Sequence, residues 1–176
     1  MAAVLIKNRT ASMNVDMYNR SAVGTTDLDN GKVFHLNAQS TASGSAECWT
    51  AIATAGSSLG IWMAASPESV LTSSKYRGID PDPRNFTNVA GLAFDAFKPV
   101  VGDIITMTAA GISGSPSTGA FVISGSQAYT LVWNAAAPAS GSTLAFRLIA
   151  ETYVSIGTGA IDTQRVLAYK LECIYN

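Results

Sequence analysis

The one histidine of this sequence is the first candidate for a catalytic residue. His35 stands between Phe34 and Leu36, in an apolar stretch typical of a β-strand. A Ser-His-Asp arrangement would have to use this imidazole as its general base. A histidine in the middle of a strand is more typical of a structural role, and we expect no nucleophile elbow beside it. The sequence therefore favours a protein that is not an enzyme.

A pair of carboxylates is the second chemical possibility, because glycosidases use two. Glu151 and Glu172 fall on two strand-like stretches near the C-terminus. Arg147 and Lys170 stand close to them along the same stretches and supply simpler, structural partners. We expect these four side chains to form cross-strand charge pairs, each modest in energy.

Metal ligation is the third possibility. Asp80, Asp82 and Asp103 could offer oxygen ligands to calcium, but their spacing matches no known calcium loop, and prolines crowd the first two. One histidine and two distant cysteines, Cys48 and Cys173, do not make a zinc site. We predict no metal and no cofactor. Both cysteines are interpreted as buried free thiols, and a disulfide stays open only if they meet in space.

Three tryptophans could form a platform for stacking sugars. Trp49, Trp62 and Trp133 all lie within apolar, strand-like stretches. Burial in the core is therefore the expectation, with display on the surface as the alternative.

The composition narrows the classes of partner. The chain is 48% hydrophobic but only 13% charged, and its formal net charge is −1. A typical soluble domain carries about 25% charged residues, so this surface relies on Ser, Thr and Gly instead. The charge gives no pull toward nucleic acid or anionic lipid. The short apolar run after Met1 predicts neither a signal peptide nor a membrane span.

Alternating apolar residues and turn signals predict a chain of short strands. We expect strands at 32–38, 47–54, 60–64, 104–108, 120–124 and 128–134, and two long strands at 144–156 and 165–175. In the first long strand, Leu144, Phe146, Leu148, Ala150, Thr152 and Val154 are expected on one face. Residues 67–74 could form one or two helical turns. The fold class predicted is all-β, an antiparallel β-sandwich or barrel-like sheet pair.

The first 28 residues show no clear periodicity. We interpret residues 1–28 as an extended N-terminal arm with apolar and basic anchor points, and an edge strand of the main domain is the alternative. Residues 29–176 form the β-rich body, and a division into two lobes, 29–110 and 119–176, hinged at 109–119, is the alternative to a single lobe. The predicted anchor points of the arm are Val4, Leu5, Ile6, Arg9, Met13, Val15, Met17, Tyr18 and Arg20.

A series of short motifs between residues 28 and 108 resembles structural proteins of phage heads. The series comprises Leu28-Asp-Asn-Gly-Lys-Val33, Glu47-Cys-Trp-Thr-Ala51, Ile61-Trp-Met63, Asn85-Phe-Thr-Asn-Val-Ala-Gly-Leu92, Ala96-Phe-Lys-Pro99 and Val101-Gly-Asp-Ile-Ile105. An Asn-Gly strand entry, an aromatic strand, a Phe-x-Asn-x-Ala-Gly segment and Gly-Asp before an apolar strand are the recurring features. The chain resembles, in this part, the decoration or cement proteins of tailed bacteriophages.

The resemblance implies a structural, non-enzymatic role. Such proteins bind the outside of the assembled capsid, often as trimers, and stabilise contacts between subunits of the major capsid protein. By this analogy the chain is made in the host cytoplasm, resides on the capsid exterior of the virion, and forms a homo-oligomer. The competing hypothesis is a carbohydrate-binding or host-recognition module of a phage fibre or adhesin, based on the tryptophans and the Ser/Thr-rich loops.

Overall fold

The computed structural model describes residues 2–54, 60–67, 82–126, 128–138, 144–157 and 163–176. The predicted helical turns at 67–74 lie almost entirely outside these residues. The described part of the chain is all-β, with two sheets that pack together. Its strands are β1 (Leu5–Arg9), β2 (Asn19–Gly24), β3 (Val33–Gln39), β4 (Trp49–Ile52), β5 (Ile61–Ala64), β6 (Ala93–Phe97), β7 (Ile104–Thr108), β8 (Ile112–Ser113), β9 (Phe121–Ser124), β10 (Leu131–Asn134), β11 (Ala145–Ile156) and β12 (Gln164–Tyr175).

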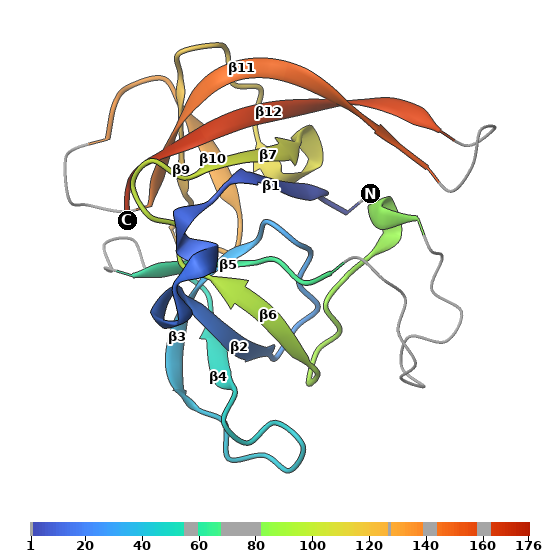
Figure 1. Ribbon diagram of the computed structural model, residues 1–176, viewed down its shortest axis with the longest axis vertical. Coiled ribbons are helices and arrows are strands. Elements are labelled where there is room, and N and C mark those ends of the chain that lie inside the picture. Colours follow the sequence, from blue (N-terminus) through green and yellow to red (C-terminus); the bar gives the residue numbers. More distant parts are fainter. Residues whose placement is uncertain (1, 55–59, 68–81, 127, 139–143, 158–162) are drawn as a thin grey trace.

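One sheet has seven strands in the order β1-β7-β12-β11-β9-β10-β8, and the other closes into a barrel, β2-β4-β3-β5-β6. Most neighbouring strands are antiparallel, but β2 with β4 and β8 with β10 are parallel. The long hairpin of β11 and β12 arches over one side of the molecule, and the barrel lies on the other (Figure 1). All eight strands predicted beyond residue 29 are confirmed, with bounds that differ by a few residues, and β6 and β8 are additional strands.

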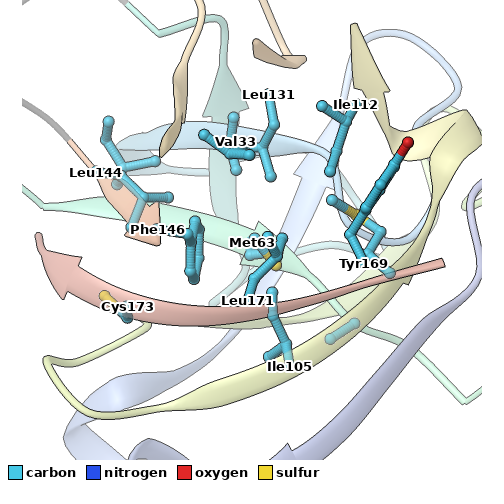
Figure 2. Close-up of a cluster of buried hydrophobic side chains, with 14 of the residues drawn as sticks. Val33, Met63, Ile105, Ile112, Leu131, Leu144, Phe146, Tyr169, Leu171 and Cys173 are labelled. Carbon is cyan, nitrogen blue, oxygen red and sulfur yellow. The ribbon is translucent and has the colours of Figure 1, made fainter. Parts of the chain in front are cut away.

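The main core lies between the two sheets. Val33, Ile61 and Met63 of the barrel pack with residues of the seven-stranded sheet, among them Ile105 and Phe146 (Figure 2). Each of these five side chains is fully or almost fully buried. Removing that much apolar surface from water is the dominant favourable contribution to folding. Because both sheets supply the same core, neither is expected to be stable alone.

A second, smaller cluster fills the interior of the barrel. Phe34 and Phe94 meet edge to face there, with ring centroids 5.6 Å apart and planes at 87°. Small residues, Ala22, Ala51 and Ala64, complete this cluster. Alternation along β3 therefore sends Phe34 into the barrel and Val33 into the main core.

The division of the chain between sheets differs from the predicted lobes. Strand β7, placed in the lobe 29–110, pairs with β12 and β1 instead. The barrel is formed by β2 to β6, and every strand from β7 onward belongs to the seven-stranded sheet. The change of sheet therefore falls at 98–103 rather than at 109–119.

The N-terminal segment, residues 2–24, is built into both sheets. Strand β1 pairs with β7 at the edge of the seven-stranded sheet, and β2 pairs with β6 and β4 in the barrel. Backbone hydrogen bonds to these partners fix the segment, so it does not extend as a free arm. The edge-strand alternative describes β1, and β2 is an integral barrel strand.

Candidate functional site

The predicted anchor residues of the N-terminal segment differ widely in exposure. Val4 is buried and bonded to β7, where its backbone N–H donates to Oγ1 of Thr108 at 3.0 Å. Leu5 and Tyr18 are half-buried, and nothing is described of the Met13 side chain. The exposed members are Ile6, Arg9, Val15, Met17 and Arg20.

Val15 and Met17 are displayed by a pair of short 3-10 turns, η1 (Ala11–Asn14) and η2 (Asp16–Tyr18), which join β1 to β2. We call residues 11–18 the display turn. Val15 is 41% exposed and Met17 is 61% exposed. Within the display turn, the N–H of Tyr18 donates to the carbonyl of Val15 at 2.9 Å.

Side chains at the start of β2 hold the display turn in shape. The amide of Asn19 donates to the carbonyls of Ser12 and Val15, at 3.1 and 3.0 Å. The guanidinium of Arg20 donates to the carbonyls of Asp16 and Asn19, at 2.9 and 2.8 Å. The carbonyls of Ser12, Val15 and Asp16 each already accept one backbone N–H, so these side chains supply a second donor to them.

A buried carboxylate anchors the same turn to the seven-stranded sheet. Asp103 is 1% exposed and accepts from the Ala11 N–H at 2.7 Å and from the Ser12 hydroxyl at 2.6 Å. It also accepts from the Val100 N–H at 3.0 Å. Three donors on one buried carboxylate compensate for its desolvation. Asp103, considered above as a calcium ligand, is thus a structural anchor.

The display turn can act chemically as a protein-binding surface. A large apolar side chain held outward by a fixed backbone loses little conformational entropy when a partner covers it. Exposed apolar groups of this kind, flanked by basic residues such as Arg9 and Arg20, are typical of interaction sites.

The single histidine lies on the core-facing side of β3. His35 is opposite Ile61 in β5 and Ile52 in β4, and it is 9% exposed. Its Nε2 has no hydrogen-bond partner among the residues that the structure describes. The structural interpretation therefore agrees with its apolar surroundings, and none of the described contacts of His35 involves a serine or a carboxylate.

Sequence reasoning missed one motif. Residues 56–60 read Gly-Ser-Ser-Leu-Gly, which fits the Gly-x-Ser-x-Gly pattern of a nucleophile elbow around Ser58. Residues 55–59 lie outside the described part of the chain. The elbow needs a helix directly after the serine, but strand β5 begins at Ile61. The context that would support a serine nucleophile is therefore not met.

One of the two candidate glutamates has a structural partner. Arg147 donates to Glu172 at 2.6 Å across β11 and β12, which confirms that predicted pair. Glu151 lies opposite Tyr169, and Lys170 lies opposite Ala150. Burial first, and then the charge of Glu151, raises the pKa of the Tyr169 phenol. The two glutamates therefore face different neighbours.

Asp82 and Asp103, two of the aspartates considered as calcium ligands, bind different partners. Asp82 forms an ion pair with Arg84, whose hydrogen bonds to the carboxylate lower the pKa of Asp82. Asp80 lies outside the described residues. Among the residues that the structure describes, no three His, Cys, Asp or Glu side chains gather closely enough to hold a metal ion.

The two cysteines are buried free thiols, as predicted. Burial, with a smaller contribution from the charge of Asp103, raises the pKa of the Cys173 thiol to about 12. A thiol in this state is a poor nucleophile at neutral pH.

The tryptophans correct an expectation. Trp133 is 39% exposed, and Trp49 and Trp62 are half-buried rather than buried. Trp133 is the third of the four residues of β10, and it lies next to Gly114. Alternation places such a side chain on the core side, but the core does not extend far enough to cover it.

Comparisons with protein-family models, with curated proteins and with solved structures find no match to this chain. The resemblance of residues 28–108 to phage decoration proteins therefore rests on its motifs alone. Within the described residues, no helix has the length and apolar character needed to cross a membrane.

Proposed function

We propose that this chain is a structural virion protein that binds the outer surface of a tailed-phage capsid and stabilises contacts between major capsid subunits. The observation that carries the proposal is the display turn. Val15 and Met17 project from a backbone fixed by Asp103, Asn19 and Arg20. A pre-organised apolar pair of this kind suits a partner protein of the assembled shell.

The motifs of the phage resemblance also support the proposal, because two of them build the fold together. Asn88 of the Phe-x-Asn-x-Ala-Gly segment donates to the Leu28 carbonyl at 2.8 Å and to Oδ1 of Asn30 at 3.2 Å. The backbones of Leu28 and Asn88 exchange two further hydrogen bonds. Residues at the two motifs thus depend on each other, as a shared structural plan would require.

Binding would proceed through side chains rather than through strand addition. Strand β1 is an edge strand, but its register shifts between Lys7 and Arg9, and both residues carry charge. Bulges and basic side chains are typical devices that prevent edge-to-edge pairing. The apolar pair of the display turn lies outside this edge and remains available to a partner.

Co-sedimentation with empty shells of a tailed phage tests the proposal. Deleting residues 1–26 would remove β1 and β2 and disrupt both sheets, so point variants are needed. We expect saturable binding by the wild type and a loss of about tenfold in affinity for Met17→Ser, as for a central interface residue. Val101→Ser is the matched control, because Val101 is 69% exposed but lies in the turn before β7.

The outcomes are distinct. No saturable binding by the wild type would reject the proposed function. Equal loss in Met17→Ser and Val101→Ser would reject the display turn as the contact.

A second candidate function gains support from Trp133. Its 39% exposure gives an aromatic face that could stack on a sugar ring, as in a carbohydrate-binding or host-recognition module. A glycan array tests it, with Trp133→Ala as the variant. Binding that this substitution abolishes would favour the alternative, and an array without signal would reject it.

A further inference from the structure

A cleft of about 480 Å³ lies between the N-terminal strand β1 and the barrel strands β2 and β6. Lys7 of β1 forms one side of it, and Arg20 and Asp95, from β2 and β6, lie across from Lys7. Phe97 and Ala65 complete the lining that matters here. The volume falls within the ~300–1,000 Å³ range of small-molecule sites.

Lys7 is the charged group inside this cleft. It is half-buried, and its ammonium lies 5.9 Å from the centroid of the Phe97 ring. Its one hydrogen bond within the described structure goes to the Ala65 carbonyl at 3.3 Å. Burial lowers the pKa of Lys7, and the nearby charge of Asp95 acts in the opposite direction. An ammonium has three N–H donors, so two remain for a ligand.

The charged side chains that line the cleft, taken together, indicate the charge of a matching ligand. Arg20 uses one guanidinium nitrogen to bind two carbonyls, and its other guanidinium donors make no hydrogen bond within the described residues. Asp95 is exposed and contributes one negative charge. Lys7, Arg20 and Asp95 together leave one net positive charge. A singly charged carboxylate matches that balance, whereas a doubly charged phosphate would meet Asp95 unfavourably.

We propose that the cleft between β1, β2 and β6 is a carboxylate-binding site, in which Lys7 and Arg20 receive the two oxygens of the ligand and Asp95 limits its charge. The apolar face of Phe97 lies against the carbon skeleton of the ligand. The cleft shares Arg20 with the display turn, but its charged ligand differs from the apolar contact of Val15 and Met17, so the two proposals are tested separately.

Nuclear magnetic resonance titration with sodium butyrate, a singly charged carboxylate with an apolar chain, at constant ionic strength, tests the site. We expect saturable shifts of the backbone amides of Lys7, Ser21 and Ala96, with a Kd at or below about 10 mM. Lys7→Met keeps the aliphatic stem and should weaken binding by about tenfold or more. Asp95→Asn should tighten it by roughly threefold.

Lys170→Met is the matched control, because Lys170 lies on β12 and away from the cleft residues. It should leave the butyrate affinity unchanged, and thermal unfolding should show that each variant is folded. Non-saturating shifts, identical shifts with sodium chloride, or unchanged binding by Lys7→Met would each overturn the proposal.

The source of the carboxylate is decided by a second arm. Butyrate that displaces the wild type from empty shells would assign the carboxylate to an acidic side chain of the shell protein. Shell binding that butyrate does not affect would assign it to a free small acid. If no shell binding occurs at all, the proposed function fails while the butyrate titration still decides the cleft.

Discussion

The hydroxyl of Ser12 donates a 2.6 Å hydrogen bond to Oδ2 of Asp103, a residue 91 positions later in the chain. This contact joins the display turn to the start of strand β7. It makes the conformation of an exposed surface depend on a buried carboxylate. The stability of the fold and the proposed binding surface are therefore coupled at one residue.

Replacing Asp103 tests this anchor. Asp103→Ala would leave the Ala11 and Val100 N–H groups and the Ser12 hydroxyl without their acceptor. We expect a loss of about 3 kcal/mol in the free energy of unfolding, measured by urea denaturation. Asp16→Ala is the control, because the Asp16 side chain is exposed, and its effect should stay within about 0.5 kcal/mol. Equal effects of the two substitutions would contradict the anchoring role.

The pair of motif asparagines is open to a double-mutant cycle. Asn88→Ala removes hydrogen bonds to the Leu28 carbonyl and to Asn30, in a buried site. We expect a cost of about 2 kcal/mol, and a coupling of about 1 kcal/mol with Asn30→Ala. Asn14→Ala, at an exposed position, should be nearly neutral. Strict additivity of the two buried substitutions would show that the motifs are energetically independent.

The strand alternation of the sequence predicts most of the sheet structure, because turn residues and apolar periodicity are local signals. It could not reveal β1 and β2. Their residues lack a clear period, and their pairing with β7, β4 and β6 depends on contacts distant in sequence. Strand β8 has two residues, too few to carry a pattern.

A bulge in β11 is a second feature that the sequence concealed. Leu148 pairs with Leu171, but Ala150 pairs with Lys170, so Ile149 is an extra residue. A one-residue shift exchanges the two faces of a strand. Beyond it, Glu151 lies opposite Tyr169, a core residue, so the cross-strand register changes after Leu148. The burial of β11 still alternates as predicted, because Ala150, Thr152 and Val154 are half-buried and their neighbours up to Ser155 are exposed. The display turn was equally hidden, since its polar anchors come from β2 and from Asp103.

Two glycines with nearly the same positive φ allow the energetic cost of that backbone conformation to be measured apart from the cost of a steric clash. Gly31 has φ +83°, and a Cβ there would lie 2.5 Å from the Met107 sulfur. Gly44 has φ +86° with nothing within 4 Å. Gly44→Ala should therefore cost about 1 kcal/mol, from φ alone, and Gly31→Ala about 1 kcal/mol more because Met107 must move. Chemical denaturation of both variants measures the difference, and equal costs would mean that Met107 adapts freely.

The pH dependence of stability should report Cys173. Its pKa is raised to about 12 in the folded protein, above the ~8.5 of an unfolded thiol. Between these values the unfolded chain loses the proton and the folded chain keeps it, so stability falls as pH rises. The fall due to this thiol is at most about 1.4 kcal/mol per pH unit.

Cys173→Ala should remove that component of the pH dependence. The measurement is the free energy of unfolding of each protein between pH 8 and about 10.5, which spans the ordinary thiol pKa. Comparing the slopes, rather than the absolute stabilities, separates the thiol from the cavity that the substitution creates. Identical slopes in wild type and variant would refute the assignment.

Site-specific photo-cross-linking tests the central claim, that the display turn contacts the capsid. Met17→p-benzoylphenylalanine places the reactive group on the most exposed apolar position of that turn, and Val101→p-benzoylphenylalanine is the control at another exposed apolar position. After irradiation on empty phage shells, position 17 should form a covalent product with the major capsid protein, and position 101 should form little. No product at position 17, or equal products at both positions, would contradict it.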